Sequence, residues 1–313
     1  MTRAFVCPGQ GSQAVGMGME LAQAFPVARE VFQEIDEALK QSLSKLMAEG
    51  PPDALTLTEN AQPALMAVSV AVIRVIEKES GKRLSDLASH VAGHSLGEYS
   101  ALAAAGALLI PDAARLLKLR GQSMQKAVPV GEGAMAALLG ADLDQAKAIA
   151  DEARQGQVCD IGNDNGPGQV VLSGSKAAID RAIQIAPTKG VKKAISLPVS
   201  APVHSALMAP AAEAMKEALD KVAFNQPSVP VVANVRAQPV SDPTEIKNLL
   251  VQQVTGMVRW RECVLAMVDH GVTKEVEVGA GKVLTGLARR IFKDLDATAV
   301  HTPAEVEAFL KTL

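Results

Sequence analysis

The chain has 313 residues, nearly half of them hydrophobic, and its 31 Lys and Arg residues almost balance its 34 Asp and Glu residues. This balance argues against a nucleic-acid partner, and the length favours one large core with an embedded subdomain over two full domains. The three cysteines are odd in number and widely spaced, no metal-ligand spacing accompanies the five histidines, and the longest apolar run is about half of the roughly 20 residues that span a bilayer. We therefore expect a cytoplasmic protein without a membrane partner, a metal ion or a disulfide framework.

Apolar periodicity predicts alternating strands and helices along most of the chain. The first part has a predicted strand over 4–7, helices over 28–47 and 62–78, a short strand over 91–92 and a helix over 112–127. The last part has a predicted helix over 209–222, a strand over 229–235, helices over 245–254 and 260–270, a strand over 275–278 and a helix that ends near 292. This alternation predicts an α/β core with a mostly parallel sheet.

The middle of the chain has a different order of elements. Strands are predicted over 134–139, 158–162, 169–173 and 191–197, with helices over 144–154 and 176–186. The order β-α-β-β-α-β is that of a ferredoxin-like unit. We therefore expect a subdomain over 129–197, inserted into a core formed by 1–128 and 198–313.

The segment Gly93-His-Ser95-Leu96-Gly97 joins a short apolar strand to an alanine-rich helix. A G-x-S-x-G sequence in this context exposes its serine on a sharp turn, and the glycines let the backbone pass close by. The amide of Leu96 would then lie at a helix N-terminus, where partial positive charge can stabilise an oxyanion. Ser95 is thus predicted to be a nucleophile that carries an acyl group.

Five histidines could supply the base that a serine nucleophile needs. His90 is expected at the surface, His270 at the end of a helix and His301 in the C-terminal tail. His94 adjoins the serine, but neighbours on a turn point in different directions. His204 remains, in a proline-bracketed loop of the kind that positions side chains. The spacing alone leaves it evenly balanced between the catalytic base and a structural role.

Hydrolases with this elbow usually place an acid between the serine and the histidine in the sequence. Asp160 and Asp164 fall in that interval, but both belong to the predicted insert. No acid stands out, so a serine–histidine dyad with its imidazole oriented by a backbone carbonyl is the better interpretation.

Arg120 shares a helical stripe with apolar residues, whereas Arg115 on the same predicted helix reaches solvent more easily. The stripe consists of Leu116, Leu117, Met124 and Ala127. An arginine that faces a core needs an anion, because an unpaired buried charge is costly. Two interpretations stay open: an internal salt bridge, or a bidentate clamp for a substrate carboxylate.

The loop after the first strand contains Gly9-x-Gly11-x-x-Ala14, which is similar to a dinucleotide-binding fingerprint. Pro8 interrupts the turn, however, and the chain is predicted to be helical where the second acid-ending strand of that fingerprint should lie. Nucleotide binding is therefore disfavoured. Gln10 is better placed to donate a hydrogen bond to an oxyanion.

Six motifs occur in an order that resembles the malonyl-CoA:acyl carrier protein transacylase family of bacterial type II fatty acid synthesis. They lie at 8–13, 93–99, 120–124, 168–174, 198–204 and 277–284. The resemblance runs from about residue 4 to residue 292 and implies an α/β-hydrolase-like core with a ferredoxin-like insert. One departure is Val203, where related polyketide acyltransferases often have Phe or Ser, which weakens any inference about discrimination at the α-carbon of the acyl group.

The resemblance also implies roles at matching positions. Ser95 would be the nucleophile, and His204 the base and then the acid toward the leaving thiol. Gln10 and the Leu96 amide would form the oxyanion hole, and Arg120 would pair with the malonyl carboxylate. The resemblance, and not the spacing, selects Gln253 over Gln252 as the residue whose carbonyl orients the histidine. The implied substrate-binding set is Arg120, Met124, Asn163 and Gln253, with Asp164 beside the expected asparagine.

The activity that the resemblance implies is a ping-pong transfer of malonyl from malonyl-CoA to the phosphopantetheine thiol of holo acyl carrier protein, by a monomer without a cofactor of its own. Because the carrier is acidic in this family, a basic docking patch is expected, with Lys189, Lys192, Lys193, Arg289 and Arg290 as candidates. Three alternatives stay open: a G-x-S-x-G thioesterase or esterase, a polyketide-pathway acyltransferase of the same fold, and an inactive acyltransferase-like domain that binds the carrier.

Overall fold

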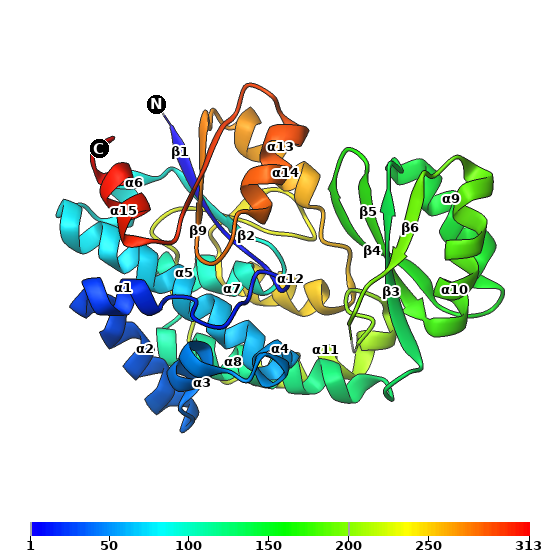
Figure 1. The fold of residues 1–313 in the computed structure, drawn as a ribbon, viewed down its shortest axis with the longest axis horizontal. Coiled ribbons are helices and arrows are strands. Elements are labelled where there is room, and N and C mark those ends of the chain that lie inside the picture. Colours follow the sequence, from blue (N-terminus) through cyan, green and yellow to red (C-terminus); the bar gives the residue numbers. More distant parts are fainter. Residues whose placement is uncertain (1, 200) are drawn as a thin grey trace.

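A computed structural model describes residues 2–199 and 201–313; Met1 and Ser200, the latter within the 198–204 motif, lie outside the described residues. The larger sheet has the strand order β10-β9-β1-β2-β7-β8 and is parallel from β10 to β7, with β8 antiparallel (Figure 1). Its strands are β1 (Arg3–Cys7), β2 (His90–Gly93), β7 (Val231–Val232), β8 (Pro239–Val240), β9 (Lys274–Val278) and β10 (Asp296–Val300).

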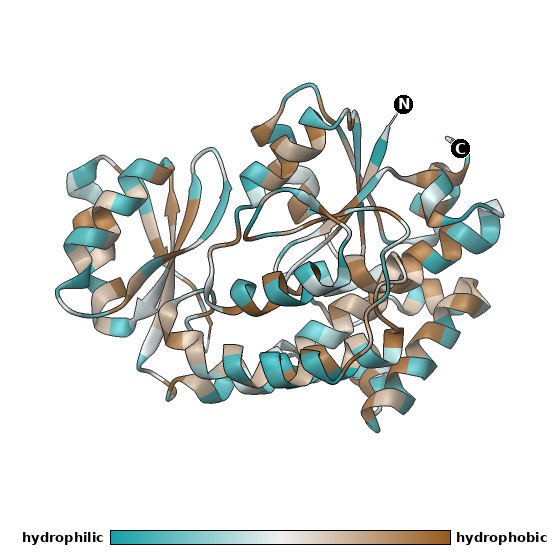
Figure 2. Ribbon diagram, turned by 180° about the vertical axis from the view of Figure 1, so that it is seen from behind, coloured by the Kyte–Doolittle hydropathy of each residue, from teal (hydrophilic) through white to brown (hydrophobic). Residues whose placement is uncertain are grey.

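Both faces of this sheet are largely apolar, because residues in β1, β2 and β7 alternate between two hydrophobic clusters. In β1, Phe5 and Cys7 face one cluster while Ala4 and Val6 face the other. A sheet that is apolar on both faces must be covered by helices on both. Figure 2 shows apolar and polar residues alternating along these helices, as expected for elements that bury one side.

The helices divide unequally between the two faces. The Phe5 face is covered by α1 (Met19–Ala24), α2 (Pro26–Leu39), α3 (Leu43–Glu49), α4 (Pro52–Thr56), α5 (Thr58–Ser80), α6 (Leu84–Leu87), α7 (Leu96–Ala104), α8 (Ile110–Ala127), the 3₁₀ helix η2 (Ala206–Met208), α11 (Ala209–Asp220), α12 (Pro243–Thr255) and α15 (Pro303–Leu310). The opposite face is covered by α13 (Trp260–Asp269) and α14 (Val283–Ile291). None of the helices in the described ranges is long and apolar enough to cross a membrane.

A smaller antiparallel sheet lies at one end of the molecule, with the strand order β4-β5-β3-β6 (Figure 1). Its elements are β3 (Gly133–Leu139), α9 (Leu143–Arg154), β4 (Cys159–Gly166), β5 (Gln169–Ser175), α10 (Lys176–Ile185), the 3₁₀ helix η1 (Ala186–Lys189) and β6 (Lys193–Ser196). It has its own apolar cluster. The expected fold class, an α/β-hydrolase-like core with a mostly parallel sheet and a ferredoxin-like insert, is confirmed.

The small sheet is attached to the larger part through backbone hydrogen bonds. Strand β4 pairs locally with the segment before α13: the amide of Asp164 donates to the carbonyl of Val258, and the amide of Val258 donates to the carbonyl of Gly162, each over 2.9 Å. The side chain of Asp164 also forms an ion pair with Arg261 at 2.8 Å. The edge of the insert is therefore fixed against the core beside the elbow.

Several predicted boundaries were wrong. The helix predicted over 28–47 is interrupted at Lys40, whose φ of 49° ends α2 and lets α3 begin in a new direction. The strand predicted over 229–235 is limited to the two residues of β7, because the chain turns at Ala237 and returns as β8. The strand predicted over 158–162 continues further, because residues 163–165 also lie within β4. Strand β10 and helix α15 follow the last predicted helix, so His301 lies between two elements and not in a tail.

Candidate active site

Ser95 lies on the turn between β2 and α7 with φ 53° and ψ −109°. The flanking glycines are sterically required. A Cβ on Gly93 would lie 1.9 Å from the carbonyl of Gly97, and a Cβ on Gly97 would lie 2.3 Å from the carbonyl oxygen of Cys7. Leu96 is the first residue of α7, and the first amides of a helix have no partner within it. The sequence thus forms the tight elbow that the G-x-S-x-G pattern predicts, with an amide available beside the serine.

The imidazole of His204 lies against the serine. Its Nε2 is 2.7 Å from Ser95 Oγ, and its Nδ1 is 2.8 Å from the carbonyl oxygen of Gln253. Since a carbonyl only accepts, Nδ1 carries the proton and Nε2 is free to accept from the hydroxyl. Burial, and then the nearby positive charge of Arg120, lower the pKa of His204 to about 3, so the ring is neutral and can act as a base.

The described residues give His204 no carboxylate partner. The two acids considered above as third members are used elsewhere: Asp160 accepts from the amide of Ala206, and Asp164 pairs with Arg261. The neighbouring Gln252 is exposed, whereas Gln253 is buried. The arrangement is therefore a dyad whose imidazole is held by a backbone carbonyl.

Arg120 reaches the same point from α8 and is 1% exposed. Its Nη2 donates to Ser95 Oγ over 3.1 Å and to Gln253 Oε1 over 2.8 Å, and its Nη1 donates to Gln62 Oε1 over 2.8 Å. It forms no ion pair with any described residue, so the internal salt bridge is not the explanation for its burial. A buried guanidinium bonded only to neutral acceptors beside the hydroxyl of Ser95 is suited to binding an anionic group of a substrate.

Two further residues lie near the guanidinium: Met124, which was predicted, and Gln62, which was not. Gln62 donates from Nε2 to the sulfur of Met124 over 3.7 Å, and both side chains are buried. Met124 therefore lies beside Gln62, which accepts a hydrogen bond from Arg120, and not at the surface. The signal that could have found Gln62 is a polar residue within a helix segment that is otherwise apolar on most sides.

Sequence reasoning also missed the roles of Glu98 and Asn234. The Oε2 atom of Glu98 accepts from Gln253 Nε2 over 2.8 Å and from the amide of Asn234 over 3.0 Å. The side chain of Asn234 accepts from the Ser95 amide and donates to the carbonyl of Gly93, each over 2.8 Å. Burial raises the pKa of Glu98 to about 7, while the two donors and Arg120 oppose that rise. The available signals were an acid directly after the elbow and an asparagine at a strand end.

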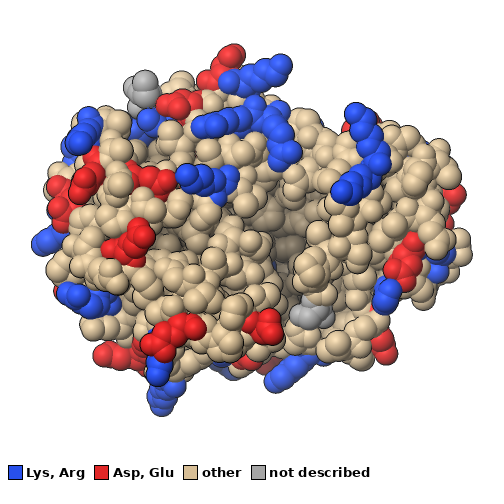
Figure 3. All heavy atoms as spheres, in the orientation of Figure 1, with Lys and Arg blue, Asp and Glu red and all other residues tan. Residues whose placement is uncertain are grey.

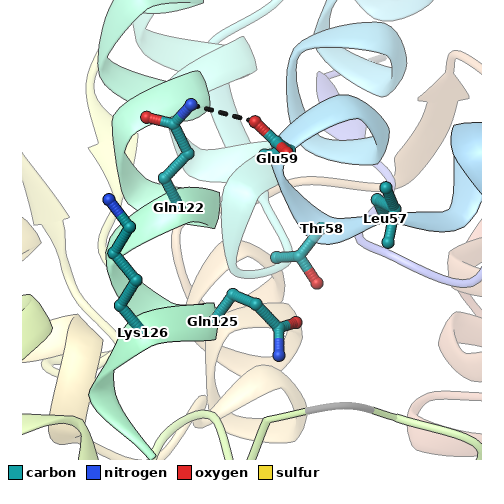
Figure 4. A pocket seen from close by; sticks show the side chains of 6 residues that line it. All are labelled: Leu57, Thr58, Glu59, Gln122, Gln125 and Lys126. Atoms are coloured by element: carbon teal, nitrogen blue, oxygen red, sulfur yellow. Dashed lines mark hydrogen bonds between the residues drawn. The ribbon is translucent and has the colours of Figure 1, made fainter.

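The side chain of Gln10 is exposed and donates to Thr58 Oγ1 over 3.3 Å. Thr58 borders a hollow of about 200 Å³ between the start of α5 and the last turns of α8 (Figure 4). Its other lining residues are Leu57, Glu59, Gln122, Gln125 and Lys126. Gln10 therefore links the loop after β1 to the rim of this hollow, and its predicted role at the oxyanion stays a prediction.

Asn163 lies in β4 opposite Val258 and is buried, and its role in substrate binding stays a prediction. Asn165, two residues further along β4, has its Oδ1 2.8 Å from Nε2 of His94, whose ring packs on Trp260 with centroids 5.6 Å apart. His94 thus turns away from the serine toward the insert, as expected for adjacent residues on a turn.

The expectation that His90 lies at the surface was wrong. It is the first residue of β2, is 8% exposed and packs against the ring of His270, with centroids 5.5 Å apart. Among residues 2–199 and 201–313, no group of three or more His, Cys, Asp and Glu side chains could hold a metal ion.

The predicted basic residues fall at two separate places. Lys189, Lys192 and Lys193 belong to η1, β6 and the turn between them, and Lys189 pairs with Glu152 at 2.7 Å. Arg289 and Arg290 lie at the end of α14. Figure 3 shows a hollow between the larger part and the smaller part of the molecule, with Lys and Arg side chains gathered above it.

Comparisons with known proteins agree with this geometry. The family described as acyl transferase domain matches residues 4–307. The malonyl CoA-acyl carrier protein transacylase of Bacillus subtilis is 45% identical over 311 residues, covering 99% of this chain and 96% of the relative. The crystal structure of an acyl-carrier-protein-S-malonyltransferase from Bartonella henselae is 55% identical, with a TM-score of 0.97 and coverage of 100% and 99%. A type II polyketide acyl-carrier protein in complex with its malonyl-transacylase also matches, at 42% identity and a TM-score of 0.96 over 100% of both chains. The chain therefore belongs to the acyl transferase family, within its malonyl CoA-acyl carrier protein transacylase group.

Proposed function

We propose that this acyltransferase moves malonyl from malonyl-CoA to the phosphopantetheine thiol of acyl carrier protein through a malonyl ester on Ser95. The observation that carries the proposal is the position of Arg120, whose Nη2 is 3.1 Å from Ser95 Oγ and whose charge has no carboxylate partner among the described residues. A malonyl group bound to the serine ends in a free carboxylate that would complete this site. An acetyl group would leave the buried arginine unpaired.

In the first half-reaction, Ser95 Oγ attacks the thioester carbonyl while Nε2 of His204 takes the hydroxyl proton. The C–S bond then breaks, the sulfur leaves with the proton held by His204, and the malonyl ester remains on the serine. In the second half-reaction the carrier thiol gives its proton to His204 and its sulfur attacks the ester carbonyl. The C–O bond breaks, and Ser95 recovers its proton.

The oxyanion of each tetrahedral intermediate requires donors that are in place before the reaction. The amide of Leu96 at the start of α7 supplies one, aided by the helix dipole. We assign the second to Gln10 in the loop after β1. Each donor would lower the barrier by roughly 3–4 kcal/mol. The chemistry requires no metal or bound cofactor.

The partners of the proposal are malonyl-CoA and holo acyl carrier protein. The relative solved as a complex of a carrier protein with its malonyl-transacylase supports this choice and keeps a polyketide-pathway carrier as an alternative acceptor. We propose that residues 129–197 form the inserted subdomain and that the carrier docks near Arg290, where α14 meets β5. The cytoplasmic location and the monomeric state stay predictions.

The proposal is tested by incubating the protein with malonyl-CoA alone and digesting it. Mass spectrometry should find a malonyl ester on the Ser95 peptide, and no ester in Ser95→Ala. Addition of holo carrier should then move malonyl to the carrier thiol. Release of free malonate to water at the same rate with and without the carrier would instead support the thioesterase alternative.

A further inference from the structure

The side-chain amide of Gln253 separates a buried carboxylate from a buried guanidinium. Its Nε2 donates to Glu98 Oε2 and its Oε1 accepts from Arg120 Nη2, each over 2.8 Å. All three side chains are at most 2% exposed. An ionised carboxylate only accepts hydrogen bonds and a guanidinium only donates them, so the amide fits between them in one orientation.

Because the amide of Gln253 lies between them, the negative charge of Glu98 does not contact the guanidinium of Arg120. If Glu98 contacted the guanidinium directly, the arginine would already hold a carboxylate and would have less to gain from one on a substrate. With the neutral amide between them, the acceptors of Arg120 are the uncharged oxygens of Gln62, Gln253 and Ser95. The Nε atom of Arg120 has no partner among the described residues.

The same carboxylate is connected to both members of the dyad. It accepts from the amide of Asn234, whose Oδ1 accepts from the amide of Ser95. It also holds the side chain of Gln253, whose backbone carbonyl is 2.8 Å from His204 Nδ1. Glu98 is itself fixed by the first turn of α7, three residues after the serine.

We propose that Glu98 is a positioning residue: through the amide of Gln253 it directs the Arg120 guanidinium toward Ser95 while leaving that guanidinium unpaired for the carboxylate of the acyl donor. This inference rests on the proposed function, in which Arg120 binds the malonyl carboxylate. In this proposal, selectivity for the acyl donor depends on the arrangement in which the Gln253 amide separates the Glu98 carboxylate from the Arg120 guanidinium.

The test exchanges the two side chains. The double variant Glu98→Gln/Gln253→Glu keeps the net charge and the two functional groups but places the carboxylate against Arg120. We expect the KM for malonyl-CoA to rise about tenfold or more, while the rate of Ser95 acetylation from acetyl-CoA does not fall. The matched control is Gln252→Glu, which adds a carboxylate at the exposed neighbouring position and should leave both reactions unchanged.

An unchanged KM for malonyl-CoA in the exchanged variant would overturn the proposal. A parallel loss with both donors would show a merely structural role and would overturn it too. If the exchanged variant does not fold by circular dichroism, Gln253→Glu alone carries the same expectation and the same contrary outcomes.

Arg120→Ala separates this inference from the proposed function. If Arg120→Ala leaves the preference for malonyl over acetyl unchanged, the proposed function fails. If Arg120→Ala loses that preference and the exchanged variant keeps it, only the role of Glu98 fails.

Discussion

Ser95 and His204 both have positive φ angles, 53° and 59°, and these two residues bring Oγ and Nε2 within 2.7 Å of each other. Such a conformation costs about 1–3 kcal/mol for a residue with a side chain. The cost at Ser95 is opposed by the hydrogen bond from its amide to Asn234, and the cost at His204 by its hydrogen bond to Gln253. The reactive geometry is therefore held by the surrounding core, and changes to that core should alter it.

Gly97→Ala should disturb the elbow without touching either reactive side chain. The new methyl group would lie 2.3 Å from the carbonyl oxygen of Cys7, so α7 must move and take Ser95 and the Leu96 amide with it. We expect a loss of about 2 kcal/mol or more in the free energy of unfolding and a slower malonylation of Ser95. Urea denaturation and mass spectrometry measure the two effects.

The control for this change is Gly286→Ala in α14. A Cβ there would meet nothing within 4 Å, and alanine favours a helix over glycine by about 0.5–1 kcal/mol. That variant should be slightly more stable and fully active. A Gly97→Ala enzyme with the stability and rate of the wild type would contradict the requirement for close backbone approach.

Arg120→Ala should change the choice of acyl donor. Removal of the guanidinium takes away the proposed partner of the malonyl carboxylate, so kcat/KM for malonyl-CoA should fall by about 100-fold or more. Acetyl-CoA should improve relative to malonyl-CoA, because no charge is left unpaired. Arg115→Ala serves as the control, since that side chain lies exposed on the same helix and pairs only with Asp112 in the described structure. Unchanged selectivity in Arg120→Ala would eliminate the carboxylate clamp.

The sequence predicted those parts of the fold in which a local pattern matches a local constraint. The strands and the amphipathic helices were predicted because their apolar residues recur at the period of a strand or of a helix. The succession of these elements then predicted the β-α-β-β-α-β order of the insert. The break at Lys40 and the short β7 were not predicted, because a residue with a side chain at positive φ carries no apolar signal. His90 was misplaced since its burial depends on His270, which is 180 positions away in sequence.

The residues of the candidate site likewise divide into those that a local pattern predicted and those that it did not. Ser95 and Arg120 followed from an elbow and from a charge on an apolar stripe, whereas Gln253 required the family resemblance to separate it from Gln252. The structure distinguishes the two by burial. Asn234 and Glu98 form hydrogen bonds between segments more than 100 residues apart, and no spacing in the sequence reports such a contact.

Arg290→Glu should weaken binding of the carrier protein. The side chain is exposed at the end of α14 and donates to Gln169 on β5 over 3.0 Å, so it lies where the insert meets the core. Because the expected carrier is acidic, we expect its KM to rise about tenfold at low salt and less at high salt. Formation of the malonyl enzyme from malonyl-CoA should be unaffected. Lys45→Glu, at an exposed position on α3, is the control. An equal effect on both half-reactions would show that Arg290 does not act in docking.

Glu275→Leu should make the stability less dependent on pH. Glu275 is fully buried in β9, and neither carboxyl oxygen has a partner among the described residues. Burial, and then the neighbouring Glu277, raise its pKa well above the usual value of 4.5. Between pH 4.5 and that raised pKa the folded state keeps a proton that the unfolded state has lost, so stability falls by up to about 1.4 kcal/mol per pH unit.

The leucine variant should lose this slope and be more stable at pH 7 and 8. Urea denaturation at pH 5, 6, 7 and 8 measures the difference, with Glu213→Gln at an exposed position of α11 as the control. A slope equal to that of the wild type would mean that Glu275 does not hold a proton in the folded state.

Between pH 5.5 and 8.5, the rate of Ser95 acylation should not change through protonation of His204. Burial, and then Arg120, lower its pKa to about 3, so the neutral ring that accepts the serine proton is present from about pH 4 upward. Glu98, with a pKa of about 7, could mask this behaviour in the wild type. The measurement is therefore made in Glu98→Gln, as the single-turnover rate of Ser95 malonylation between pH 5.5 and 8.5. The rate should stay level across that range. If the rate instead falls toward acid pH with a midpoint near pH 6.5, His204 titrates as an ordinary histidine. Water then reaches its ring, and neither burial nor the charge of Arg120 lowers its pKa.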